Sequence, residues 1–186
     1  MNEANNNSGS DPATSDSPKQ YSHTQEVISN IPYILMIVLG MVIFFTGLQP
    51  SLWAWPVSLF YLAYGIGGAV WIMVFVCPYC RYYDTRSCPC GYGRIAVKLR
   101  PRQADDCFAE KFKKHIPVIV PLWILPVIIA GIALIRGFSV GYLLLVVAFA
   151  LEAFVVLPLV STQHGCKECP QRDTCPWMHL KPGKAA

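Results

Sequence analysis

The chain has 186 residues, of which 54% are hydrophobic and only 14% are charged. Because the apolar residues occur in long blocks, this composition excludes an ordinary soluble globular domain, which needs more polar surface. The formal net charge of +4 comes mostly from one loop and gives no reason to expect nucleic acid as a partner.

The first 26 residues are polar, low in complexity and almost free of apolar side chains. Such a segment buries too little surface to offset the entropy lost on ordering, so we expect a disordered tail over 1–26. No charged region with a small-residue cleavage site precedes the first apolar block. We therefore expect the first helix to be a retained span and not a removed signal peptide.

Four apolar blocks follow, and each is about as long as the roughly 20 residues that a helix needs to cross a bilayer. They cover 31–48, 55–76, 116–135 and 139–160. The third block contains three prolines, which membrane helices tolerate because neighbouring helices and water satisfy the freed backbone groups. The sequence thus predicts an all-α integral membrane protein with four transmembrane helices.

Two of the connections between these blocks are very short, which predicts two helical hairpins. Fourteen of the fifteen Lys and Arg residues then fall on one side of the membrane, and only Arg136 falls on the other. The positive-inside rule makes the basic side cytoplasmic, and we expect the cell inner membrane. The chain divides into a tail (1–26), a first hairpin (27–76), a Cys-rich basic loop (77–115), a second hairpin (116–160) and a Cys-rich C-terminal segment (161–186).

All eight cysteines fall on the predicted cytoplasmic side. Disulfides are rare in that compartment, so the cysteines indicate metal or redox chemistry instead of a covalent framework. They form two similar patterns, Cys77-x2-Cys80-x7-Cys88-Pro and Cys166-x2-Cys169-x5-Cys175-Pro, each after a predicted hairpin. This similarity suggests an internal repeat, in which a pseudo-twofold four-helix bundle would bring both patterns to one end.

The first pattern offers a complete set of four thiolate ligands for zinc or iron. The set consists of Cys77, Cys80, Cys88 and Cys90. Its Cys-Pro-Tyr-Cys sequence at 77–80 also resembles the glutaredoxin active-site tetrapeptide, and that resemblance implies thiol–disulfide exchange. No thioredoxin-like βαβ pattern surrounds these four residues.

The second pattern has three cysteines, Cys166, Cys169 and Cys175, and must take a fourth ligand from elsewhere. His164 is close in sequence, and Cys107 lies in a short amphipathic stretch, 105–115, that is expected at the membrane interface. His179 is a further candidate.

Iron–sulfur and zinc both fit these ligands. Four of the cysteines precede proline, as cysteines do in bacterial ferredoxin sequences. We therefore expect an iron–sulfur electron-transfer subunit of an oxidoreductase, with no catalytic residue assigned, that links a soluble redox partner to a quinone or membrane complex; the redox protein partner is soluble or membrane-bound. The alternatives are a zinc-stapled membrane scaffold and a membrane thiol–disulfide oxidoreductase. The usual hydrolase, kinase and dinucleotide-binding signatures are missing from the sequence.

Glu152 is the only acidic residue within the four predicted blocks. A charge inside a membrane costs several kcal/mol, so this carboxyl should face the bundle interior. It is either a proton acceptor near a quinone or a neutral carboxyl with a purely structural hydrogen bond.

Overall fold

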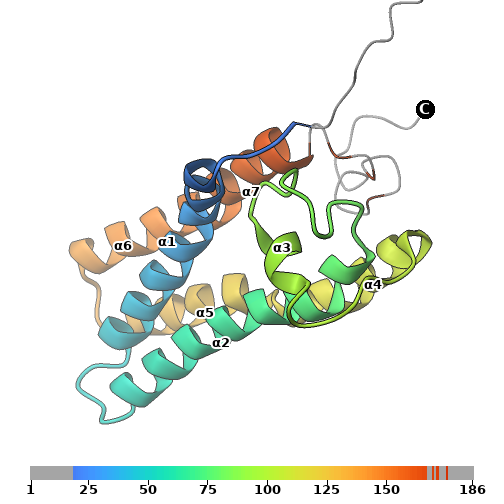
Figure 1. Ribbon diagram of the computed structural model, residues 1–186. Helices are drawn as coiled ribbons and strands as arrows, with labels where there is room; N and C mark the ends of the chain where they lie inside the picture. Colours follow the sequence, from blue (N-terminus) through green and yellow to red (C-terminus); the bar gives the residue numbers. More distant parts are fainter. Residues whose placement is uncertain (1–18, 167–168, 170, 172–174, 176–186) are drawn as a thin grey trace, which may run out of the picture.

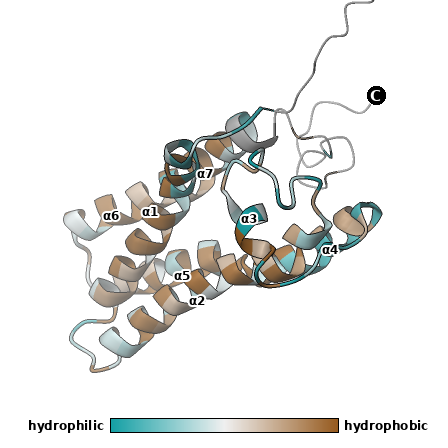
Figure 2. Cartoon of the chain, in the orientation of Figure 1, coloured by the Kyte–Doolittle hydropathy of each residue, from teal (hydrophilic) through white to brown (hydrophobic). Residues whose placement is uncertain are grey.

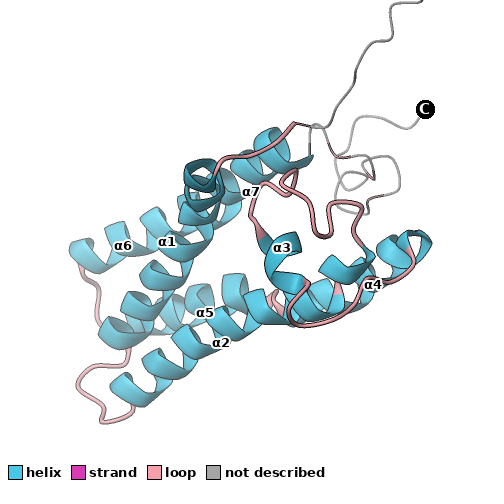
Figure 3. Cartoon of the chain, in the orientation of Figure 1, coloured by secondary structure: helices cyan, strands magenta, loops and turns pink. Residues whose placement is uncertain are grey.

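The computed structural model describes residues 19–166 together with residues 169, 171 and 175. Every regular element within this described part of the chain is helical (Figure 3). Four helical segments are long and apolar enough to cross a membrane: His23–Gly47, Ala54–Tyr79, Asp105–Arg136 and Val140–Gln163. The predicted all-α fold is therefore confirmed for the described residues, as are the four helices long and apolar enough to cross a membrane.

Within the described residues, the spanning segments are built from six of seven α-helices, with short 3₁₀ and π-helical pieces between or after them (Figure 1). The α-helices are α1 (His23–Gly47), α2 (Ala54–Phe75), α3 (Tyr92–Ala96), α4 (Phe108–His115), α5 (Pro121–Arg136), α6 (Val140–Leu151) and α7 (Leu157–Val160). In Figure 2 the long helices are mostly hydrophobic, whereas polar residues concentrate in the loops around α3 and α4.

Helix α1 begins at His23, before the end of the tail predicted over 1–26. A capping box explains the earlier start: Ser22 Oγ accepts from the Gln25 amide, and Gln25 Oε1 accepts from the Ser22 amide at 2.9 Å. These bonds satisfy two backbone donors that a helix end otherwise leaves without partners. The next residue, Glu26, is buried, so tertiary contact holds this first turn as well.

The core lies where α1 packs against α2, α5 and α6. Tyr61 of α2 fills the space beside Gly40 of α1 and donates a 2.8 Å hydrogen bond to the carbonyl of Leu122 in α5. A Cβ at Gly65 would lie 2.7 Å from Ile37, so this glycine also permits close helix approach. This is the role that small residues commonly have between membrane helices.

Helix α6 is followed by a π-helical segment, Glu152–Val156, before α7 begins. Trp123 of α5 donates from Nε1 to the carbonyl of Ala153 at 3.1 Å, within this segment. The Glu152 side chain is buried, and its Oε1 atom has no hydrogen-bond partner among the described residues. Since π-helical turns often mark functional sites, Glu152 remains the membrane residue of greatest interest.

Candidate metal centre

The Cys-Pro-Tyr-Cys sequence forms a tight turn directly after α2. Cys77–Tyr79 is one turn of 3₁₀ helix, which the Cys80 amide closes by donating to the Cys77 carbonyl at 3.0 Å. Pro78 is fully buried, and its carbonyl accepts from the Gln103 amide at 2.9 Å. Hydrogen bonds within the turn and from Gln103 therefore fix its backbone, as a chelating pair of cysteines requires.

The Cys-Pro-Cys-Gly sequence forms a second turn, which leads into α3. The Gly91 amide donates to the Cys88 carbonyl at 3.1 Å, and Gly91 has a φ of 71°, a left-handed conformation that glycine adopts without steric cost. Two residues later, the Gly93 amide donates to the sulfur of Cys88 at 3.4 Å. A Cβ at Gly93 would lie 2.5 Å from the Tyr82 carbonyl oxygen, so this close approach also needs glycine.

Backbone amides reach three of the sulfurs. Besides the Gly93–Cys88 bond, the Tyr82 amide donates to Cys80 and the Gln171 amide donates to Cys169. A hydrogen bond from an amide favours the thiolate over the neutral thiol. Such bonds also orient metal-bound thiolates and tune the potential of iron–sulfur clusters.

The described cysteines of both patterns lie close enough together for their thiolates to repel one another. Cys88 is central, because it interacts in this way with Cys77, Cys80 and Cys169. Cys90 interacts with Cys77, and Cys175 interacts with Cys169. We call these six residues the thiol cluster: Cys77, Cys80, Cys88, Cys90, Cys169 and Cys175.

Gln171 fixes the C-terminal segment against the loop after α2. Its side chain is buried, accepts from the Arg81 amide at 3.1 Å and donates to the carbonyls of Tyr79 at 3.3 Å and Asp105 at 3.4 Å. Because Gln171 lies two residues after Cys169 in the chain, these bonds hold Cys169 beside the first turn. Local sequence patterns gave no signal for this contact.

Burial makes the ionised form of these thiols unfavourable. It is the main cause that raises the pKa of Cys80 to about 12, and the nearby Cys169 and Cys88 act in the same direction. Burial also raises the pKa of Cys169, with Cys175 and Cys88 as further causes. The hydrogen bonds from backbone amides act in the opposite direction, because they favour the thiolates. A bound cation would stabilise these thiolates further.

In chemical type, the cysteine thiolates of this cluster are therefore suitable ligands for zinc or iron. Within the described part of the chain, no three Cys, His, Asp or Glu side chains converge on one point as ligands of a single ion do. The side chains of Cys166 and His164, and all of His179, lie outside the described residues. Cys107 begins the turn into α4, two positions after Asp105, whose carbonyl accepts from Gln171.

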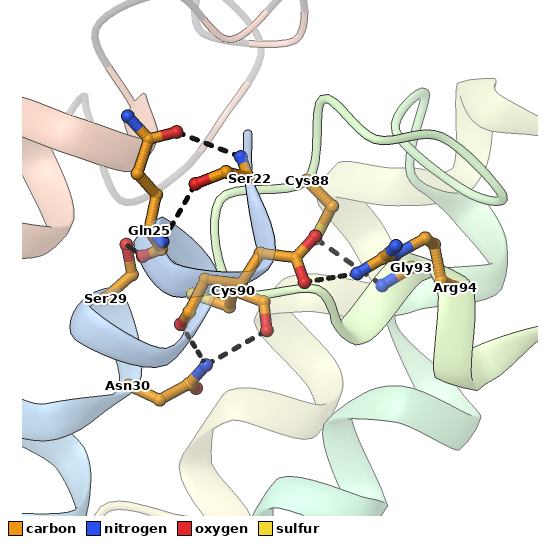
Figure 4. A network of polar contacts seen from close by, with 9 residues as sticks. Ser22, Gln25, Ser29, Asn30, Cys88, Cys90, Gly93 and Arg94 are labelled. Atoms are coloured by element: carbon orange, nitrogen blue, oxygen red, sulfur yellow. Dashed lines mark hydrogen bonds and ion pairs between the residues drawn. The ribbon is translucent and has the colours of Figure 1, made fainter. Parts of the chain in front are cut away.

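The N-terminal end of α1 also packs against this region, a contact that the sequence did not indicate (Figure 4). Asn30 donates from Nδ2 to the carbonyl of Cys90 at 3.0 Å, and Glu26 forms an ion pair with Arg94. The Tyr21 amide donates to the Arg86 carbonyl at 2.8 Å. The capping box Ser22-His-Thr-Gln25 is the one local signal that could have placed Glu26 in an ordered turn.

No protein-family model matches the chain, and no curated protein or solved structure does either.

Proposed function

We propose that this protein is a membrane-bound iron–sulfur electron-transfer subunit. The observation that carries the proposal is the thiol cluster, in which mostly half-buried cysteines from two distant segments interact electrostatically and three sulfurs accept hydrogen bonds from backbone amides. Burial and the neighbouring thiols disfavour the thiolate form of these cysteines. They therefore need a bound cation to ionise and act as ligands.

The ligands divide between two neighbouring centres. Cys77, Cys80, Cys88 and Cys90 bind the first. The second takes Cys166, Cys169 and Cys175 with a fourth ligand from Cys107 or His164. The electrostatic interactions of Cys169 with Cys80 and Cys88 support neighbouring centres, which would allow electrons to pass from one to the other.

The Cys-Pro sequences favour an iron–sulfur cluster over a single zinc ion, because four of the cysteines precede proline, as cysteines do in bacterial ferredoxin sequences. The raised pKa of Cys80 weighs against thiol–disulfide exchange, because reactive cysteines have lowered pKa values.

The proposed architecture is two helical hairpins, each followed by a cysteine segment, with the two segments forming a cap on the cytoplasmic face. The repeated Cys-x2-Cys…Cys-Pro pattern supports a duplicated unit, and the charge asymmetry supports the orientation in an inner membrane. A soluble or membrane redox protein would exchange electrons at the cap. A quinone in the bilayer is the second partner, with Glu152 as its proton acceptor.

Metal and acid-labile sulfide analysis of anaerobically purified protein tests this function, together with visible spectra before and after dithionite. We expect iron and sulfide in equal amounts and absorption that bleaches on reduction. Replacing Cys80 with Ser should remove iron and colour together. Stoichiometric zinc without sulfide would establish the scaffold alternative, and a metal-free protein with a reversible dithiol would establish the oxidoreductase.

A further inference from the structure

A cavity of about 390 Å³ lies between the first turn of α1 and the segment around α3. Its polar lining comes from His23, Glu26 and Asn30 of α1 and from Arg94 and Lys98 of the α3 segment. This volume is within the range of small-molecule sites, which runs from about 300 to 1,000 Å³. The cavity adjoins Cys90 but does not depend on any metal at the thiol cluster.

Two polar atoms of this lining have unmet hydrogen-bonding capacity. The Glu26 side chain is only 7% exposed, and its Oε2 atom pairs with Arg94. Its Oε1 atom and the Nε of Arg94 are both buried, without a hydrogen-bond partner among the described residues. Gly91 permits this arrangement, since a Cβ there would lie 3.0 Å from Glu26 Oε2. Both atoms are closed to solvent, so a ligand in the cavity reaches them only when the Glu26 and Arg94 side chains turn towards it.

The charges favour an anionic ligand. Glu26 and Arg94 neutralise each other, and Lys98 adds an uncompensated positive charge to the lining. A ligand that suits all three residues carries a negatively charged acceptor for Arg94 and Lys98 and a hydroxyl donor for Glu26. A phosphodiester with a hydroxylated substituent has both groups in one small molecule.

The position of the cavity relates it to the bilayer. Helix α1 has 25 residues, and at 1.5 Å per residue it is longer than the hydrocarbon core of about 30 Å. The proposal places the first turn of α1, which bears the charged residue Glu26, at the level of the lipid headgroups. From the cavity, Val27, Ile31, Ile34 and Val38 follow one face of α1, and each is at least 42% exposed. This apolar stripe would lie beside an acyl chain.

We propose that this cavity binds the headgroup of an anionic phospholipid whose phosphodiester carries a free hydroxyl, as in phosphatidylglycerol. The phosphate lies beside Lys98 and the Arg94 guanidinium, and the hydroxyl donates to the Glu26 carboxylate. The bound lipid thereby bridges α1 and the cysteine loop at the point where Asn30 and Glu26 already join them.

Native mass spectrometry of the full chain in neutral detergent tests this site by titration with three lipids of identical acyl chains. The probes are phosphatidylglycerol, phosphatidylethanol and phosphatidylcholine. We expect one tight adduct with phosphatidylglycerol. Phosphatidylethanol has the same charge but lacks the hydroxyl, so it should bind about ten-fold more weakly. Phosphatidylcholine should bind more weakly still.

Two lysine variants separate the cavity from general surface attraction. Lys98→Gln should weaken phosphatidylglycerol binding about five-fold, the effect of one basic residue near an anionic lipid. Lys114→Gln removes an exposed charge on α4, outside the cavity, and should leave the tight adduct unchanged. Equal weakening by both substitutions would refute the site.

Two competitors identify other occupants. If soluble glycerol 3-phosphate binds as tightly as phosphatidylglycerol, the ligand is a free phosphate ester and the lipid assignment is wrong. If a neutral ubiquinone displaces the lipid at equal concentration, the cavity is a quinone site and the proposal also fails. None of these outcomes depends on iron, so failure here leaves the proposed electron-transfer function standing.

Discussion

Gly93→Ala is the substitution that most directly perturbs the geometry of the thiol cluster. The new Cβ would lie 2.5 Å from the Tyr82 carbonyl oxygen and 3.5 Å from the Cβ of Cys88. The backbone of residue 93 cannot easily move away, because two hydrogen bonds hold it. The Gly93 amide donates to the Cys88 sulfur, and the Gly93 carbonyl accepts from the Asp84 amide. Relieving the overlap therefore breaks at least one of these bonds.

The expected cost follows from three contributions. Overpacking a tight site costs about 1–3 kcal/mol, and losing one hydrogen bond costs about 0.5–1.5 kcal/mol. The better helix propensity of alanine offsets about 1 kcal/mol of this, since Gly93 lies in α3. We expect a net destabilisation of about 1–3 kcal/mol, together with a loss of iron, because the Tyr82 amide also donates to Cys80.

Unfolding by SDS titration measures the stability, and iron per chain measures the effect on the cluster. Gly67→Ala is the matched control, because a Cβ at this helical glycine would meet no atom within 4 Å. It should keep its iron and gain stability slightly. A Gly93→Ala protein that matches the control in both measurements would show that the turn does not position Cys88 as we describe.

Three further predictions use other contacts. Gly40→Ala would place a Cβ 2.4 Å from the hydroxyl oxygen of buried Tyr61, so SDS unfolding should show a loss of about 1–3 kcal/mol relative to Gly67→Ala; equal stability would contradict this packing. Gln171→Ala leaves the carbonyls of Tyr79 and Asp105 without this donor, so limited proteolysis should cut the C-terminal segment faster than in the exposed-site control Gln163→Ala. Equal rates would show that Gln171 does not hold this segment in place. In chelator-treated protein the pKa of Cys80 is raised from 9.0 to about 12, so the native state holds this proton more tightly than the unfolded state. That stabilisation is present below pH 9 and is lost as the pH rises towards 12. If Cys80 is buried as described, Cys80→Ser should make the free energy of unfolding depend less on pH in this window.

The sequence predicted the four spanning helices because hydropathy over some 20 residues reports directly on burial in lipid. It placed the start of α1 too late, because the tail was judged by composition, whereas Ser22 and Gln25 act through backbone hydrogen bonds. The π-helical segment at Glu152 has no comparable local signal, since its geometry depends on packing against α1 and α5.

The cysteine spacing predicted chelating turns. The backbone forms tight turns at Cys77–Cys80 and Cys88–Gly91, and their chelating role stays a prediction. Their position next to Cys169 was beyond the reach of spacing alone. It depends on Gln171, whose partners Tyr79 and Asp105 are 92 and 66 residues away in the chain. Contacts of that separation leave no periodic trace in a single sequence.

The distance between Glu152 and the cysteines limits how protons and electrons could be coupled. Helical structure continues from Glu152 to Cys166, which places them roughly 20 Å apart at about 1.5 Å per residue. Under the proposed function, Glu152 is therefore too far away to exchange protons directly with a centre that Cys166 helps to bind, and a quinone that uses both would lie between them along the bundle. On this geometry Glu152→Gln should leave the iron content and spectrum unchanged and slow only quinone reduction. Loss of iron in that variant would mean that Glu152 supports the fold instead of carrying protons.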